Sequence, residues 1–489
     1  MNRITDKLQN RVMDAEKAAH LIQSGMCIGA SGFTLVGYPV LVPQKLAELG
    51  LARDLTVLTG ASVGDELDGS LFRAGLMKYR APYQSDKAVR RGINSGMVGY
   101  NDLHLSHMPA MLDRKTGPKI DFAIVECAAV TDEGILLGLS VGASDCFIRN
   151  AENIILELNT SLPTELLGIH DIYSVGESCI DITSPGDRIG SPLVPYDPNK
   201  IQAIVVNDGK SSYPHFNPPD DISAAIADNI IKLLKSEVDA GRQPKGLRPI
   251  QSGVGNVANA VLTGLGRGFS GLSMYTEVLQ DGAFNLIESG VIEQASTTAL
   301  SLSKSCFDAL CENISYFKER IVIRPQELSN SPEVIRRLQL ISLNTPIEVD
   351  IYGNVNSTHI MGSNIMNGIG GSGDFARNAG LTIFATGSLA KGGLISCIVP
   401  MVSHVDHTEH DVDIIVTENG VADLRWKTPR ERAELIIENC AHPDYRPMLR
   451  EYFNEACKKV GGQTPHVLSK ALSWHERYSE TGTMMPQQA

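Results

Sequence analysis

Residues 26–62 read MCIGASGFTLVGYPVLVPQKLAELGLARDLTVLTGAS, and this stretch decides the fold class. Met26 to Ala30 is a short apolar run typical of a buried strand, and Ser31-Gly32-Phe33 predicts a turn after it. The spacing of apolar residues from Val42 to Leu49 predicts a helix, and Leu55 to Leu58 predicts a second strand. Strands that alternate with helices indicate an α/β fold with a largely parallel sheet.

The second half of the chain repeats this plan. Ile250 to Asn256 precedes a helical pattern and resembles the first strand and turn. Leu272 to Glu277 takes the place of Leu55 to Ser62, and Asp413 to Glu418 parallels Asp121 to Glu126. Three matches in the same order predict two related tandem α/β domains.

A proline-rich segment marks the expected boundary between the domains. Ser211 to Asp220 contains three prolines, and the residue before each proline is biased against helix. We therefore expect an N-terminal α/β domain over residues 1–218 and a C-terminal α/β domain over residues 219–489.

Composition and charge exclude several classes of protein. Lys and Arg total 43 against 56 Asp and Glu, a net charge of −13, which disfavours a nucleic-acid partner. No run of about 18 apolar residues predicts a membrane span, and the N-terminus has no apolar signal core. Nine cysteines without a CxxC pair are typical of buried thiols, so we expect a cytoplasmic protein. Glycine, at 45 residues, exceeds the average share of about 7%.

The densest glycine segment is Asn367 to Phe375, where consecutive amides could bind an anion. An ordinary tight loop explains such a segment equally well. No Gly-Lys-Ser/Thr follows it, so it is not a nucleotide-binding P-loop. Gly253-x-Gly255 lacks the third glycine of a dinucleotide fingerprint, which disfavours a nicotinamide dehydrogenase.

Two glutamates end predicted buried strands. Glu277 follows the apolar run Leu272 to Thr276, and Glu418 ends the run from Asp413. A carboxylate in this position costs desolvation energy unless it is paired or used in function. From the residues alone, a strand-end glutamate that reaches solvent or caps a helix is the commoner case.

Two groups of histidines could supply metal ligands: His104 with His107, and His404 with His407 and His410. Neither group forms an HExxH motif, and such spacings recur by chance, so a metal site is disfavoured. The chain also lacks a Gly-x-Ser-x-Gly elbow, which argues against a serine hydrolase.

Six motifs stand in order along the chain, and together they carry a resemblance that spans nearly its whole length. They are Ser252-Gly-Val-Gly-Asn256, Thr276-Glu-Val-Leu-Gln-Asp-Gly282, Ser329-Asn-Ser-Pro-Glu-Val-Ile-Arg-Arg337, Asp350-Ile-Tyr-Gly-Asn-Val-Asn-Ser-Thr358, Gly368-Ile-Gly-Gly-Ser-Gly-Asp-Phe-Ala-Arg377 and Cys440-Ala-His-Pro-Asp-Tyr-Arg-Pro447. The set resembles the acetyl-CoA hydrolase/transferase branch of class I CoA-transferases, which includes succinyl-CoA:acetate and propionyl-CoA:succinate CoA-transferases. The resemblance implies the CoA-transferase fold and a homodimer.

The resemblance also implies site residues by position. Glu277 matches the nucleophilic glutamate, the backbone amides of Val254 and Gly371 match the oxyanion donors, and Asn330 and Glu418 match polar active-site positions. The implied CoA-binding residues are Gln251, Ser252, Gly253, Val254, Gly255, Asn256, Asn367, Gly371 and Lys391.

At the acid pocket, Ser62 and Ser85 match hydroxyl positions, and the latter is often threonine in relatives. Relatives would carry arginine in the loop Asn207 to Ser212, where this chain offers only Lys210. Ala143 stands where relatives often carry asparagine. These departures leave the identity of the acid open.

The implied activity is transfer of CoA between small carboxylic acids of the acetate, propionate and succinate class through a glutamyl-CoA thioester. A glutamate is ionised near neutral pH without a partner base, so it can attack an acyl-CoA thioester directly. We expect no permanently bound cofactor and no metal, with CoA as a substrate. The alternatives are an acyl-CoA hydrolase with the same site, a non-catalytic CoA-binding protein and a metal-dependent hydrolase.

Overall fold

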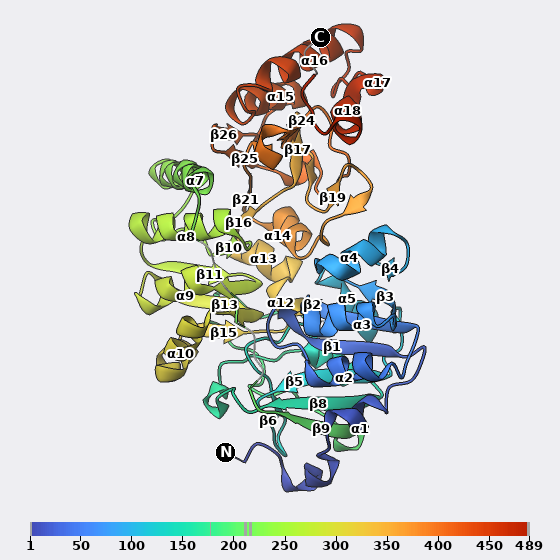
Figure 1. Ribbon diagram of the computed structural model, residues 1–489. Coiled ribbons are helices and arrows are strands. Elements are labelled where there is room, and N and C mark those ends of the chain that lie inside the picture. The colour runs from blue at the N-terminus through green and yellow to red at the C-terminus, as the bar shows by residue number, and fades with distance from the viewer. Residues whose placement is uncertain (1, 177, 210–212, 215–217, 487–489) are drawn as a thin grey trace. The chain divides into compact units, whose positions relative to one another are not determined.

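The computed structural model describes residues 2–176, 178–209, 213–214 and 218–486, which fold into two units (Figure 1). Unit 1 comprises Met1–Phe216 and Ser273–Leu338, and unit 2 comprises Asn217–Leu272 and Gln339–Ala489. The domains expected over 1–218 and 219–489 divide the chain by sequence, and they stay a prediction. The units divide it differently, because Ser273–Leu338, which includes Glu277, packs with the N-terminal part of the chain.

Unit 1 is built on a seven-stranded sheet in the order β4-β3-β2-β1-β5-β8-β9, and every neighbouring pair in it is parallel. The strands are β1 (Cys27–Thr34), β2 (Leu55–Ser62), β3 (Met77–Ala81), β4 (Gly99–Tyr100), β5 (Phe122–Cys127), β8 (Asn153–Asn159) and β9 (Ile201–Asn207). The α-helices of this part are α1 (Ala15–Ala19), α2 (Leu41–Leu49), α3 (Ser70–Arg73), α4 (Lys87–Asn94), α5 (His107–Asp113) and α6 (Ser144–Asn150). Shorter turns of helix are η1 (Asp6–Arg11), η2 (Asp65–Gly69), η3 (Thr164–Leu166) and η4 (Pro198–Lys200). A short antiparallel pair joins β6 (Ala129–Val130) to β7 (Ile135–Leu136).

The central strands of this sheet are apolar because helices cover them. The first four residues of β5 are buried, and β1 is buried except at its last residue. Strands buried on both faces have near-continuous apolar sequences, which is the pattern of residues 26–30 and 121–125. The predicted α/β fold with a largely parallel sheet is therefore confirmed.

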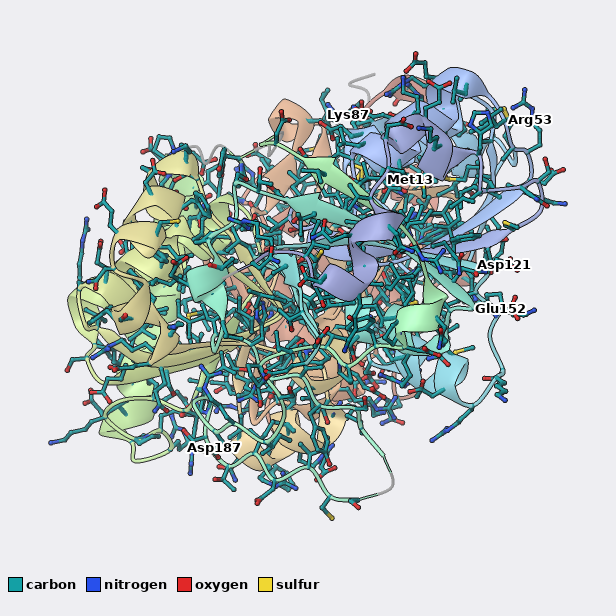
Figure 2. The ribbon with its side chains drawn as sticks, turned by 90° about the horizontal axis from the view of Figure 1, so that it is seen from below. Met13, Arg53, Lys87, Asp121, Glu152 and Asp187 are labelled. Atoms are coloured by element: carbon teal, nitrogen blue, oxygen red, sulfur yellow. The ribbon has the colours of Figure 1, made fainter. Side chains whose placement is uncertain are left out.

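The amino-terminal edge of the sheet lies away from the carboxyl ends at which ligands bind in open α/β folds. Figure 2 labels Asp121 and Glu152, which precede the neighbouring strands β5 and β8. The Asp121 carboxylate accepts a hydrogen bond from the Cys27 amide at 2.8 Å, so it fixes the start of β1 against β5. This aspartate is therefore structural.

The second segment of unit 1, Ser273–Leu338, adds short strands and helices. Its strands pair in parallel as β12 (Val278–Gln280) with β14 (Ala299–Ser301) and β13 (Ile292–Thr297) with β15 (Ile321–Ile323), and β11 (Leu272–Tyr275) crosses the boundary between the units. The helices are α9 (Asp281–Glu288), α10 (Lys304–Glu312), α11 (Ile314–Lys318), α12 (Gln326–Ser329) and α13 (Pro332–Leu338). A fully buried ion pair between Arg324 and Asp171 ties this segment to the N-terminal one.

Unit 2 contains the consecutive sheet strands β10 (Ile250–Ser252), β16 (Ile341–Asn344), β21 (Leu381–Ala385), β25 (Ile414–Thr417) and β26 (Gly420–Asp423). Its smaller strands are β17 (Glu348–Asp350), β18 (Val355–Asn356), β19 (His359–Ile360), β20 (Asn364–Ile365), β22 (Leu389–Ala390), β23 (Ile395–Ser396) and β24 (Ile398–Val399). Its helices are α7 (Asp221–Asp239), α8 (Asn256–Gly268), α14 (Ser372–Asn378), α15 (Pro429–Asn439), α16 (Arg446–Lys459), α17 (Leu468–Ala471) and α18 (Ser473–Thr481), with short turns η5 (Lys391–Gly393) and η6 (Glu409–Asp411). Helix α7 lies beside α8 (Figure 1). No helix in the described part of the chain is long and apolar enough to cross a membrane.

Strand order corrects one of the three sequence matches between the halves. In unit 1, β5, β8 and β9 follow β1 across the sheet, and in unit 2, β16, β21 and β25 follow β10. Asp413 to Glu418 therefore occupies the place of β9, and the predicted match to Asp121–Glu126 is wrong. The local pattern is shared because each aspartate accepts an amide hydrogen bond from the neighbouring strand, Asp413 from Thr382 at 2.9 Å.

The N-terminus of α2 is occupied by a buried glutamate from another strand. Glu157, at 1% exposure on β8, accepts hydrogen bonds from the amides of Val40, Leu41 and Val42 at 2.9, 3.0 and 2.7 Å. These amides have no partner within the helix, and the positive end of the helix favours an anion. Burial raises the pKa of Glu157, and the three amides oppose that rise.

Glu157→Gln should lower the free energy of unfolding by about 2 to 3 kcal/mol, because the side-chain amide would turn a donor toward helix amides that need an acceptor. Urea denaturation of the two proteins measures the difference. Glu133→Gln, at an exposed turn in the same unit, is the matched control and should change stability little. Equal stabilities for Glu157→Gln and the control would contradict this account of α2.

Candidate active site

Glu277 follows the buried strand β11 and is itself half-buried. Its backbone carbonyl accepts three hydrogen bonds: from the amide of Thr298 at 2.9 Å, from the amide of Ala299 at 3.1 Å and from the hydroxyl of Thr297 at 2.8 Å. The main chain at Glu277 is therefore fixed, and the side chain extends from a rigid point.

Asn330 holds the carboxylate of Glu277. Its Nδ2 donates to Oε1 of Glu277 at 2.7 Å, and Asn330 is fully buried. Asn330 follows α12, whose first residue, Gln326, donates through its amide to the Gly142 carbonyl at 2.8 Å and through Nε2 to the Leu105 carbonyl at 3.0 Å. The structure thus brings Glu277 and Asn330 together, as the resemblance implies.

Ser62 lies at the carboxyl end of β2, where a buried arginine fixes the backbone. Arg80 donates to the Ser62 carbonyl at 2.7 Å and pairs with Asp68 at 2.7 Å, and both charged side chains are fully buried. Burial raises the pKa of Asp68, and the charge of Arg80 opposes that rise. The Ser62 hydroxyl is buried and donates to the Ser31 carbonyl at 3.3 Å. Its neighbour Ala61 shares a buried apolar cluster with Val278, which follows Glu277.

Ser85 reaches the neighbourhood of Glu277 through a tyrosine. Burial raises the pKa of Tyr83, a hydrogen bond with the Ser85 side chain lowers it, and the negative charge of Glu277 raises it further. Tyr83 also packs against the cluster that contains Val278. Ala61, beside Ser62, and Tyr83, the partner of Ser85, therefore both pack against the cluster that contains Val278.

The predicted CoA-binding loop, Gln251 to Asn256, leads into the N-terminus of α8 in unit 2. Gly255 adopts a φ of 109°, which favours glycine, and α8 begins without a capping side chain at this position. The side chain of Val254 is 52% exposed, whereas that of Gln251 is buried and accepts from the Ser342 hydroxyl at 2.9 Å. The loop therefore exposes Val254, while its first residue, Gln251, makes hydrogen bonds inside the unit.

Gly371 immediately precedes α14, and the side chains around it are held by hydrogen bonds. The Ser372 hydroxyl lies 2.8 Å from the Ile369 carbonyl and 3.1 Å from Nε2 of the buried His407. Asn367 donates through Nδ2 to the carbonyls of Ser357 at 3.0 Å and Gly368 at 2.9 Å. His407 therefore supports the glycine-rich segment, a use that the sequence spacing did not indicate.

Glu418 follows β25 and is held by Ser388. Its Oε2 accepts the Ser388 amide at 2.8 Å, and its Oε1 accepts the Ser388 hydroxyl. Lys391 is exposed at the start of η5 with a φ of 51°. The loop residue Lys210 lies outside the described residues.

The histidines form no metal site in the described part of the chain, which contains no group of three or more His, Cys, Asp or Glu residues arranged to hold a metal ion. His404 lies against His359, with ring centroids 3.9 Å apart, and contacts Asp406 at 3.3 Å. His104 and His107 make an edge-on ring contact.

Comparison with known proteins gives two family matches. Residues 1–206 match the acetyl-CoA hydrolase/transferase N-terminal domain, and residues 307–453 match the C-terminal domain of the same family. The chain is 51% identical to the succinyl-CoA:acetate CoA-transferase of Clostridium kluyveri over 98% of its length and 91% of that protein.

The chain belongs to the acetyl-CoA hydrolase/transferase family. Other members include the acetyl-CoA hydrolase of Schizosaccharomyces pombe, 42% identical over 97% of this chain and 96% of that one. The propanoyl-CoA:succinate CoA transferase of Escherichia coli is 40% identical over 97% of this chain and 98% of that one. The predicted family, and with it the prediction of an enzyme, are confirmed.

Solved structures agree on the fold. RipA from Yersinia pestis superimposes with a TM-score of 0.72 at 24% identity, covering 93% of this chain and 98% of that one. A 4-hydroxybutyrate CoA-transferase from Porphyromonas gingivalis gives a TM-score of 0.65 at 23% identity, covering 91% and 98%. This family member therefore has the fold of CoA-transferases, as predicted.

Glu327 lies on α12, the helix that precedes Asn330, and it is a buried acid that the family motifs did not indicate. It is 7% exposed, and its Oε2 has no hydrogen-bond partner within the described residues. Burial, with the nearby charges of Asp145 and Asp113, raises its pKa from 4.5 to about 7, and Arg149 opposes that rise. The folded protein therefore binds a proton between about pH 4.5 and 7 that the unfolded chain does not.

Stability should fall as the pH rises through this window, because folding must keep Glu327 protonated or bury its charge. Glu327→Gln should raise the free energy of unfolding by about 2 to 3 kcal/mol at pH 8 and by under about 1 kcal/mol at pH 5. Urea denaturation at both pH values measures this, with the exposed Glu319→Gln as control. A difference between Glu327→Gln and wild type that does not change with pH would contradict the assignment.

Proposed function

We propose that this protein is an acyl-CoA:carboxylate CoA-transferase that moves CoA between small carboxylic acids through a glutamyl-CoA thioester on Glu277. The observation that carries the proposal is the fixed main chain of Glu277, whose half-buried carboxylate is held by Asn330 at 2.7 Å. An unperturbed glutamate is ionised near neutral pH, so a nucleophile of this type needs no partner base. The 51% identity to a succinyl-CoA:acetate CoA-transferase supports the same activity.

The reaction begins with attack of a Glu277 oxygen on the thioester carbonyl of the acyl-CoA. The C–S bond breaks, CoA leaves as a thiolate, and an acyl-glutamyl anhydride remains. The thiolate then attacks the glutamyl carbonyl, the anhydride C–O bond breaks, and the first acid leaves as a carboxylate. Glutamyl-CoA remains, and an acceptor carboxylate reverses both steps.

Backbone and side-chain donors would stabilise the two tetrahedral oxyanions. We assign the amides of Val254 and Gly371 to the oxyanion on the acyl carbon, where one preorganised donor is worth about 3 to 4 kcal/mol. We assign Asn330 to the oxyanion on the glutamyl carbon, and the hydrogen bond from its Nδ2 to Oε1 of Glu277 supports this assignment. Glu418, held by Ser388, supplies a further polar group.

Substrate contacts follow from the same assignment. The open N-terminus of α8 at Gly255 offers amides to an anionic part of CoA, together with the remaining residues of the loop Gln251 to Asn256. Asn367 and Lys391 complete the proposed CoA set, and Ser62 and Ser85 would hold the acid. The homodimer and the cytoplasmic location stay predictions.

Acetyl-CoA hydrolysis is the second candidate, since a hydrolase of Schizosaccharomyces pombe is 42% identical to the chain. The same nucleophile would serve, and water would take the place of the acceptor acid. The difference lies in whether water reaches the anhydride or the thioester.

Glu277→Ala should lower the exchange rate by at least about 10³-fold, because no other group would form the covalent intermediate. The measurement is transfer of CoA from acetyl-CoA to a second acid. Glu288→Ala, an exposed change on α9, is the matched control. Wild-type protein incubated with acetyl-CoA should carry one CoA, less one water, on the peptide that contains Glu277. An adduct on another residue would refute the nucleophile.

Transfer and hydrolysis are separated by their dependence on an acceptor. With acetyl-CoA and a panel of small carboxylates, a transferase should form new acyl-CoA in proportion to the acceptor, while free CoA stays low. Chromatography of both products measures the balance. Release of free CoA at the same rate with and without acceptors would instead establish the hydrolase.

A further inference from the structure

Asn330 is itself held by the residue before it. The Ser329 hydroxyl lies 2.9 Å from Oδ1 of Asn330 and 3.4 Å from the Gln326 carbonyl, and both Ser329 and Asn330 are fully buried. A hydrogen-bond chain therefore runs from the Ser329 hydroxyl through the Asn330 amide to the Glu277 carboxylate.

The chemistry of its two partners fixes the orientation of the Asn330 side-chain amide. An ionised carboxylate only accepts hydrogen bonds, so the nitrogen of the Asn330 amide faces Glu277 and its oxygen faces Ser329. A hydroxyl that donates to the amide oxygen polarises the amide and strengthens its N–H as a donor.

Hydrogen bonds fix the main chain on both sides of Asn330. The backbone N–H of Asn330 donates to the Gln326 carbonyl at 2.9 Å, and the Tyr275 hydroxyl donates to the Leu328 carbonyl at 2.6 Å. The oxygen and nitrogen of an asparagine side chain are nearly equal in size, so packing alone does not distinguish the two orientations of the amide.

We propose that Ser329 is a positioning residue that keeps the Asn330 N–H aimed at Glu277 during turnover, an inference that rests on the proposed function. In the free enzyme the negative charge of Glu277 orients the amide. Acylation removes that charge, and Ser329 then holds the donor in place. When the CoA thiolate attacks the glutamyl carbonyl, Nδ2 of Asn330 is therefore still oriented to donate a hydrogen bond to the developing oxyanion.

The test is a double-mutant cycle with Ser329→Ala, Asn330→Ala and the double variant. Exchange is measured at saturating substrate, with urea denaturation to show that each protein is folded in the assay. Ser329→Ala should lower kcat about tenfold with little change in the KM for acyl-CoA, which corresponds to about 1.4 kcal/mol. In the Asn330→Ala background it should cause no further loss.

Three further proteins sharpen the result. Ser331→Ala changes the buried serine on the other side of Asn330, and it should retain kcat because the hydrogen bond to Oδ1 of Asn330 comes from Ser329. Ser329→Thr keeps the hydroxyl and should recover most of kcat, whereas Ser329→Cys, with a weaker donor, should fall between serine and alanine.

The outcomes separate this inference from the proposed function. Equal losses from Ser329→Ala in both backgrounds, or no loss in wild type, would overturn the positioning role while the CoA adduct still maps to Glu277. An adduct elsewhere would overturn the proposed function itself, and the inference with it. If Ser329→Ala does not fold, the same cycle is read with Ser329→Cys.

Discussion

The main chain at Glu277 is fixed by hydrogen bonds from Thr297, Thr298 and Ala299. These residues hold the Glu277 carbonyl, and Thr298 also accepts the Val141 amide through its carbonyl and the Gly142 amide through its hydroxyl oxygen. The Thr298 hydroxyl in turn donates to the Arg324 carbonyl at 2.7 Å. One short segment thus links the candidate nucleophile to two distant parts of the chain.

Gly142, whose amide donates to the Thr298 hydroxyl, is required to be glycine by a different neighbour. A Cβ at Gly142, whose φ is 52°, would lie 2.6 Å from the Gly32 carbonyl oxygen. Gly255 is glycine because its main chain adopts a φ of 109° at the start of α8. Gly142 shows a second reason for glycine, which is close approach between buried main chains at the carboxyl edge of the sheet.

The sequence indicated the fold class and the strand-end position of Glu277, because apolar runs and strand ends are local patterns, whereas only the family resemblance implied its role as nucleophile. Strand order is not local, so the Asp413–Glu418 pattern was matched to the wrong strand of the first half. The contacts of Arg80 and His407 were not predicted for the same reason. Each acts through partners that a spacing rule does not connect, such as the Ser62 carbonyl 18 residues from Arg80 or the Ser372 hydroxyl 35 residues from His407.

The helices that follow β1 and β10 differ in how their N-termini are capped. That of α2 is filled by the Glu157 carboxylate, whereas that of α8 begins at Gly255 without a side chain. The Glu157 carboxylate is a permanent internal anion at the N-terminus of α2. An anionic ligand could bind there only by displacing this carboxylate, which would leave a buried charge without its hydrogen-bond donors. Two halves that share an architecture therefore differ in how the charge at these two helix N-termini is balanced.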